Sequence, residues 1–186
     1  MLTYQTRHSS HLDTIVAAGL AYCHSLRHFK CGDTETGNGA SLTNASISRL
    51  AAACPNLTHV SLEASTCLTD SSLLALVTKC PDLQYIEISG NDKVSGNVEG
   101  PALEELRQDA SLGKKLQKLR LTDQCLYAEK FSKMLKSLSA KRKKLAIEVG
   151  QVHERGIGVN TWLGGKKKSG YQALGGPGGF SQYGGF

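Results

Sequence analysis

A short segment of the chain occurs twice, beginning once at Cys54 and again at Cys80. Cys54-Pro-Asn-Leu-Thr-His-Val-Ser-Leu62 returns as Cys80-Pro-Asp-Leu-Gln-Tyr-Ile-Glu-Ile88. Each copy alternates apolar and polar residues, which is the pattern of a strand with one buried face. A period of about 20 to 50 residues is typical of architectures that stack copies of one supersecondary unit. The repeat therefore constrains the fold more strongly than any other feature of the sequence.

A helix is predicted after the first of these two strands. Leu73, Leu76 and Val77 follow the three-four spacing of a helix face, and Leu68-Thr-Asp70 precedes them. In the next copy, Val94-Ser-Gly96 is expected to take the place of that tripeptide, in a repeat that is lengthened between residues 96 and 113. One unit is thus a strand, a turn and a helix.

Weaker copies extend the pattern toward the N-terminus. One such unit runs from Cys23 to Cys54 and is longer than the unit from Cys54 to Cys80. Its strand begins after Cys23, and its helix follows Leu42-Thr-Asn44. Before that strand, the spacing of Val16, Leu20 and Cys23 indicates the helix of a repeat whose own strand is absent.

Toward the C-terminus, the pattern predicts a strand over residues 116–121, a helix over 131–138 and a closing strand over 145–149. Because one strand and one helix cannot bury their apolar sides alone, we expect an α/β solenoid with parallel strands on its concave face and helices outside. It spans residues 1–150, with about four to five repeats of which the first is partial. Residues 151–186 are expected to form a basic, flexible tail, because glycine is the commonest residue from Gly156 onward.

The motif Cys-Pro-Asn-Leu, followed by Leu-Thr-Asp and then by a second copy at Cys80, resembles the cysteine-containing class of leucine-rich repeats. That class is typical of F-box/LRR proteins and their F-box-less relatives. The resemblance covers residues 12–150 and is strongest from Cys54 to Asn91. It implies substrate recognition in an SCF-type ubiquitin ligase, with a substrate or the cullin adaptor complex as partner, or a free-standing LRR regulator. No F-box-like segment precedes the repeats, so a fragment of a longer protein or a free-standing relative is expected.

On each strand, the apolar residues are expected to point inward, toward the helices. The polar residues between them are the candidate binding residues, because they point to the concave face. Solenoids bind extended partners on the surface that these polar residues form. Tyr85 with Lys118 and Arg120 would give an aromatic and cationic anchor of the kind found in interface hot spots. The residues expected on the concave face are His28, Lys30, His59, Ser61, Tyr85, Glu87, Lys118 and Arg120, with Ala146 and Glu148 on the last strand.

Chemical motifs give little support to an enzyme, a metal site or a cofactor. Cys23, His24, His28 and Cys31 form the densest Cys/His cluster, but Cys23 and Cys31 fall on core positions of the repeat, so zinc is not expected. Only Cys67 and Cys125 are expected as exposed turn thiols. No glycine-rich phosphate loop lies between a strand and a helix, and the adjacent Glu104 and Glu105 point in different directions on a helix.

Charge is divided unevenly along the chain. Residues 1–106 hold 6 Lys/Arg and 11 Asp/Glu, a net of −5, whereas residues 107–186 hold 16 and 5, a net of +11. The runs Lys141–Lys144 and Lys166–Lys168, with the aromatic residues of the tail, leave nucleic-acid binding by the tail as an alternative function. The chain contains no apolar run of membrane-spanning length and no secretory signal, so we expect it in the cytoplasm or nucleus. We also expect a monomer with no membrane partner.

Overall fold

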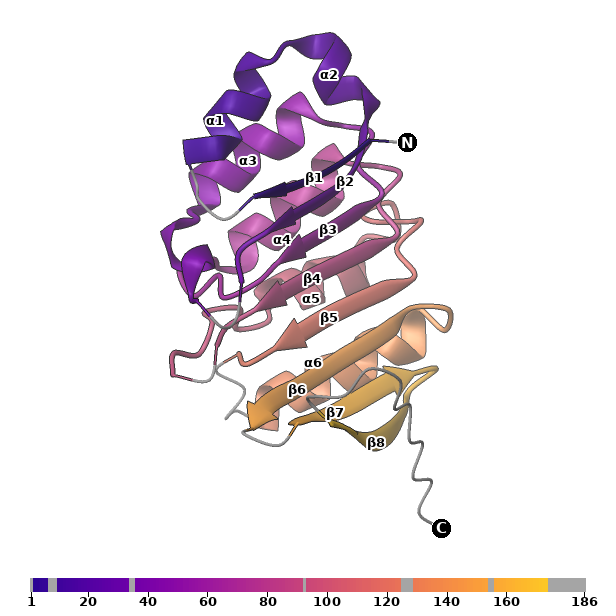
Figure 1. Cartoon of the computed structure of the whole chain (residues 1–186). Coiled ribbons are helices and arrows are strands. Elements are labelled where there is room, and N and C mark those ends of the chain that lie inside the picture. The colour runs from indigo at the N-terminus through magenta and orange to yellow at the C-terminus, as the bar shows by residue number, and fades with distance from the viewer. Residues whose placement is uncertain are drawn as a thin grey trace.

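A computed structural model of the chain describes residues 2–6, 10–33, 36–91, 93–124, 129–153 and 156–173. They form a mixed α/β fold around one eight-stranded sheet, in which the strands follow one another in chain order (Figure 1). Strands β1 to β6 are parallel, whereas β7 pairs antiparallel with both β6 and β8. The strands are β1 (Leu2–Thr6), β2 (Leu26–Cys31), β3 (His59–Leu62), β4 (Tyr85–Ser89), β5 (Lys118–Thr122), β6 (Ala146–His153), β7 (Gly156–Leu163) and β8 (Lys166–Ala173).

The α-helices connect the parallel strands and lie on one face of the sheet (Figure 1). The opposite face of β2 to β6 carries no helix among the described residues, and we call it the open face. The helices are α1 (Ser10–Ala17), α2 (Leu20–Ser25), the 3-10 helix η1 (Asn38–Ser41), α3 (Asn44–Ala53), α4 (Asp70–Lys79), α5 (Pro101–Gln108) and α6 (Glu129–Lys141).

The core forms from the apolar positions that the repeat predicts. Val60 and Leu62 of β3 are fully buried, and the strand register aligns them with Ile86 and Ile88 of β4. Burial of one such side chain contributes about 1.5–3 kcal/mol. The strand positions predicted from the repeat are therefore confirmed. The same alignment continues through buried Phe29, Cys31, Leu119, Leu121, Ile147 and Val149.

The repeat cysteines are part of this core, as predicted. Cys54 and Cys80 end α3 and α4, and the Cys80 thiol donates a hydrogen bond to the Cys54 carbonyl at 3.6 Å. Burial raises the pKa of both thiols to about 12. These cysteines are therefore protonated and unreactive at neutral pH.

The Leu-Thr-Asn and Leu-Thr-Asp tripeptides join neighbouring helices. The Asn44 side-chain oxygen accepts hydrogen bonds from Thr69 N–H at 3.0 Å and Ser72 Oγ at 2.6 Å, at the start of α4. The Asp70 carboxylate accepts from the backbone N–H groups of Glu99, Gly100 and Ala102 at 2.8–3.0 Å, at the start of α5. Helix N-termini leave such donors without a partner inside the helix. Each tripeptide therefore caps the helix of the next unit.

Two details of the predicted repeats are wrong. The first helix is preceded by a strand, since β1 pairs in parallel with β2, and it is broken at Gly19 into α1 and α2, which leaves Leu20 72% exposed. In the lengthened repeat, Val94 is 54% exposed, and Val98 occupies the buried position instead. The parallel bridge between Thr69 and Asn97 places Gly96, and not Val94, opposite Leu68.

The predicted flexible tail is wrong for residues 156–173, and the predicted domain end at residue 150 falls inside β6. Gly164 and Gly165 have φ values of 57° and 78°, which is the left-handed backbone of a two-residue hairpin turn between β7 and β8. Val159 and Trp162 of this hairpin are 7% and 9% exposed. The backbone hydrogen bonds between the strands and the burial of these side chains thus offset the conformational entropy that this glycine-rich segment loses on folding. The rest of the predicted tail, 174–186, lies outside the described residues.

Candidate functional site

Two rows of side chains cross the open face from β2 to β6. The strand register aligns the first polar position of each strand in one row and the second in another. All eight candidate residues lie in these rows and are partly buried. The first row is His28, His59, Tyr85, Lys118 and Ala146, and the second row is Lys30, Ser61, Glu87, Arg120 and Glu148.

The first row is a series of three neighbouring rings with a cation at one end, and the His28 ring is tilted by 53° against His59. The His28 and His59 ring centroids are 4.3 Å apart, and His59 stacks on Tyr85 at 6.1 Å with an interplanar angle of 22°. The Lys118 ammonium lies 6.0 Å from the Tyr85 ring centroid. Burial and the neighbouring His59 lower the pKa of His28, and burial together with Glu87 raises the pKa of Tyr85. At neutral pH the rings of His28 and Tyr85 are therefore uncharged.

The second row is a network in which carboxylates hold the cations. Glu87 accepts hydrogen bonds from Ser61 at 2.8 Å and from the Tyr85 hydroxyl at 3.0 Å. Arg120 Nε lies 3.5 Å from Glu87 and 3.9 Å from Glu148, and Lys118 lies 2.8 Å from Glu148. The anchor predicted from Tyr85, Lys118 and Arg120 is thus brought together, but its cations are compensated by carboxylates within the face.

Glu63 and the hairpin were not among the candidate residues. Lys30 pairs with Glu63, which directly follows β3, at 2.5 Å. The register extends the second row from Glu148 to Thr161 and Lys168. The Gly164-Gly165 dipeptide, which favours a two-residue hairpin turn, is the sequence signal that would have found this extension.

The other motifs do not assemble a reaction site. Within the described residues, no three His, Cys, Asp or Glu side chains are placed to hold a metal ion. Cys67 is exposed, as predicted, and Cys125 lies outside the described part of the chain. Glu104 is bound by Arg107 and Gln108, and these hydrogen bonds lower its pKa to about 2.

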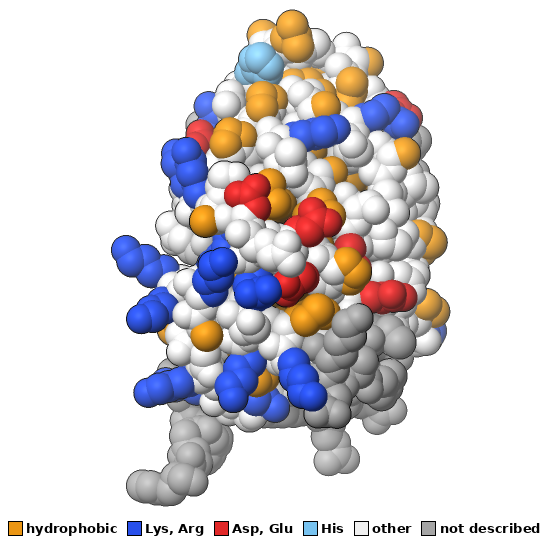
Figure 2. All heavy atoms as spheres, turned by 180° about the vertical axis from the view of Figure 1, so that it is seen from behind, with side chains coloured by type: hydrophobic (Ala, Val, Ile, Leu, Met, Phe, Trp, Pro, Cys, Tyr) orange, Lys and Arg blue, Asp and Glu red, His pale blue; other side chains and the backbone are white. Residues whose placement is uncertain are grey.

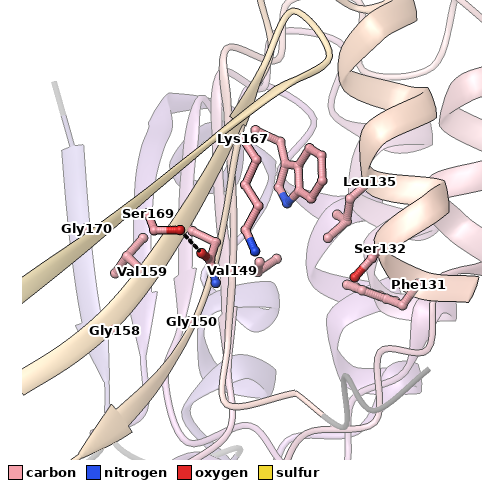
Figure 3. A pocket seen from close by; sticks show the side chains of 12 residues that line it. Phe131, Ser132, Leu135, Val149, Gly150, Gly158, Val159, Lys167, Ser169 and Gly170 are labelled. Atoms are coloured by element: carbon pink, nitrogen blue, oxygen red, sulfur yellow. Dashed lines mark hydrogen bonds between the residues drawn. The ribbon is translucent and has the colours of Figure 1, made fainter. Parts of the chain in front are cut away.

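A hollow of about 450 Å³ lies between α6 and the strands β6 to β8 (Figure 3). Phe131 and Leu135 of α6 face it on one side, and Lys167 of β8 faces it on the other. The Lys167 ammonium lies 6.0 Å from the Trp162 ring centroid, and Ser169 donates to Asn160 at 2.7 Å. The described lining contains no acid and base pair, so it gives no support to catalysis.

Comparisons with known proteins do not assign this surface. No model of a known protein family matches the chain, and a search of curated proteins finds no significant relative. In the part of the chain that the structure describes, none of the helices combines the length and apolar character that a bilayer crossing requires. The geometry of the open face is therefore the basis for a function.

Proposed function

We propose that this chain is a leucine-rich-repeat solenoid of the cysteine-containing class, whose open face binds an extended segment of a protein partner. The observation that carries the proposal is the pair of continuous rows on β2 to β6. Neighbouring strands lie about 4.8 Å apart, so each row is about 19 Å long. An extended peptide of about six residues has that length.

The rows suit recognition of a specific side-chain pattern. His59 and Tyr85 offer ring surface for stacking, while the carboxylates of Glu87 and Glu148 hold Lys118 and Arg120 in fixed positions. A surface whose polar groups are already positioned loses less side-chain entropy when a partner binds. Tyr and Arg are also the residues enriched at interface hot spots. These features support a binding surface, and we propose no enzymatic activity.

The resemblance of the repeats suggests the biological setting. We propose substrate recognition in an SCF-type ubiquitin ligase or a role as a free-standing LRR regulator, as a monomer in the cytoplasm or nucleus. In the first case the partners include a substrate and the cullin adaptor complex. In the second case the chain binds a regulator directly.

Affinity capture with the full-length protein and two triple variants tests the proposal. The first variant replaces Tyr85, Lys118 and Arg120 with alanine, and the second replaces Lys79, Asp82 and Lys115. The first variant removes the ion pairs of Lys118 and Arg120, and the second removes the pair of Asp82 with Lys115, away from the open face. We expect the first variant alone to lose specific partners, each with at least a tenfold drop in affinity because hot-spot residues contribute about 2 kcal/mol or more.

Circular dichroism and thermal unfolding establish that both variants are folded. Recovery of a cullin adaptor with the unmodified protein supports the ligase setting, and its absence among otherwise specific partners favours the free-standing regulator. Partner sets that are the same for the unmodified protein and the open-face variant would contradict the assignment of the open face.

A further inference from the structure

Several lysine and arginine side chains before α6 form ion pairs, whereas most of the exposed lysines described in and after α6 do not. The ion pairs between described side chains include Lys30, Lys115, Lys118 and Arg120, which all precede α6. Seven exposed lysines that follow in the chain form no ion pair with a described acidic side chain, and we call them the basic end. They are Lys136, Lys141, Lys143, Lys144, Lys166, Lys167 and Lys168.

The fold brings these lysines together from two segments. Gly165 in the hairpin turn donates its N–H to Ser139 of α6 at 3.1 Å, and its backbone lies against Ala140. This contact places Lys166 beside the last turns of α6, which carry Lys136 and Lys141. In the view from the helix side, Lys and Arg side chains gather over the lower part of the molecule (Figure 2).

The lysines of β8 project from both faces of the sheet. Lys167 pairs with Trp162, which pairs in turn with core residue Ile147, so Lys167 lies on the helix side. Lys168 pairs with Thr161 in the row that continues from Glu148, so it lies on the side of the open face. Positive charge therefore extends around the edge of the sheet from one face to the other.

Three described acidic groups near this end form hydrogen bonds or ion pairs with residues outside it. Glu104 is held by Arg107 and Gln108, and Glu148 is held by Lys118. Asp109 accepts a hydrogen bond from the backbone N–H of Ser111 at 2.8 Å. The basic end thus presents several ammonium groups to an external anion.

We propose that the basic end binds the phosphate backbone of double-stranded nucleic acid without sequence preference. Flexible lysines suit phosphates along a duplex, since each ammonium contributes a point charge and releases condensed counterions. Trp162 is only 9% exposed, so it offers little surface for stacking on an unpaired base. A charge distribution that wraps an edge contacts both sides of a groove, whereas a flat membrane would meet only one face of it.

The test is fluorescence anisotropy with labelled 20-base-pair DNA and RNA duplexes across a series of NaCl concentrations. The logarithm of the binding constant should fall linearly with the logarithm of salt, with a slope of about −0.9 for each phosphate neutralised. Replacing Lys166, Lys167 and Lys168 with glutamine should weaken binding and reduce the magnitude of the slope by up to about 2.7. A second variant, Lys136, Lys141 and Lys144 to glutamine, tests the helix side without altering the hairpin.

A matched control replaces Lys30, Lys79 and Lys115 with glutamine, which removes the same charge elsewhere on the molecule. These lysines have partners in Glu63, Ser48 and Asp82, and their loss should leave duplex binding unchanged. Absence of binding at low salt would overturn the proposal, as would equal weakening in the control. Binding to phosphatidylserine vesicles but not to duplexes would overturn it in favour of a membrane. The open-face variant with alanine at Tyr85, Lys118 and Arg120 should still bind duplexes through the basic end.

Discussion

At the scale of single residues, Asp70 joins two units of the fold. Its carboxylate accepts hydrogen bonds from three backbone N–H groups at the start of α5. We predict that Asp70→Ala lowers the free energy of unfolding by about 1–2 kcal/mol, since those donors lose their acceptor. Urea denaturation measures the loss. Asp82→Ala removes only an exposed ion pair and should cost much less than Asp70→Ala; equal losses would contradict the capping role.

His28 gives a second prediction at this scale. Its pKa is lowered by burial and by His59, so the folded state binds a proton less readily than the unfolded state. Between the unfolded value of about 6.5 and the lower folded value, stability must therefore fall as the pH falls. We expect an NMR titration midpoint of His28 below 6.5, and a smaller loss of thermal stability between pH 7 and pH 5 in His28→Gln. A midpoint above 6.5 would contradict the burial of this ring beside His59.

At the scale of secondary-structure elements, the β7–β8 hairpin is the largest departure from the sequence prediction. Its turn depends on two glycines in different surroundings. Gly164 has open space where a Cβ would lie, whereas a Cβ on Gly165 would lie 3.1 Å from the Ala140 Cβ. The turn therefore determines both how β7 pairs with β8 and how closely the hairpin packs against α6.

We predict that Gly164→Asn changes the free energy of unfolding by less than about 0.5 kcal/mol, because Asn tolerates the left-handed backbone. Gly165→Ala should lower it by about 1–2 kcal/mol, because alanine does not tolerate that backbone and also crowds Ala140. Urea denaturation gives both values, and hydrogen exchange of β8 amides should become faster in Gly165→Ala alone. Equal effects of the two substitutions would contradict this turn.

The alternation of apolar residues made β2 to β6 predictable, since it decides which side chains face the helices. Val60 and Ile86 are buried and Tyr85 is on the open face for that reason. The hairpin was not predicted because a glycine-rich segment favours disorder, although Gly164-Gly165 is also a dipeptide that favours a two-residue hairpin turn. The pairing of Lys118 with Glu148 could not be predicted, because it depends on the register and side-chain geometry of two strands that are distant in sequence.

At the scale of the whole molecule, the charge division of the sequence becomes a spatial one. Carboxylates neutralise the cations of the open face, so ring surface and fixed hydrogen-bonding groups determine what it recognises. Lysines gather around α6 and β8, where we propose that they contact phosphate. The molecule thus offers two surfaces of different chemistry on one sheet.

Photo-crosslinking tests the central claim, that the open face binds a protein segment. Azidophenylalanine replaces Tyr85 in one protein and Thr78, an exposed residue of α4, in another. The aromatic replacement keeps the ring at position 85 and its place in the row. After irradiation in cell extract, mass spectrometry identifies the adducts. We predict a discrete protein adduct at position 85 and none at position 78; adducts at position 78 with none at position 85 would contradict the account.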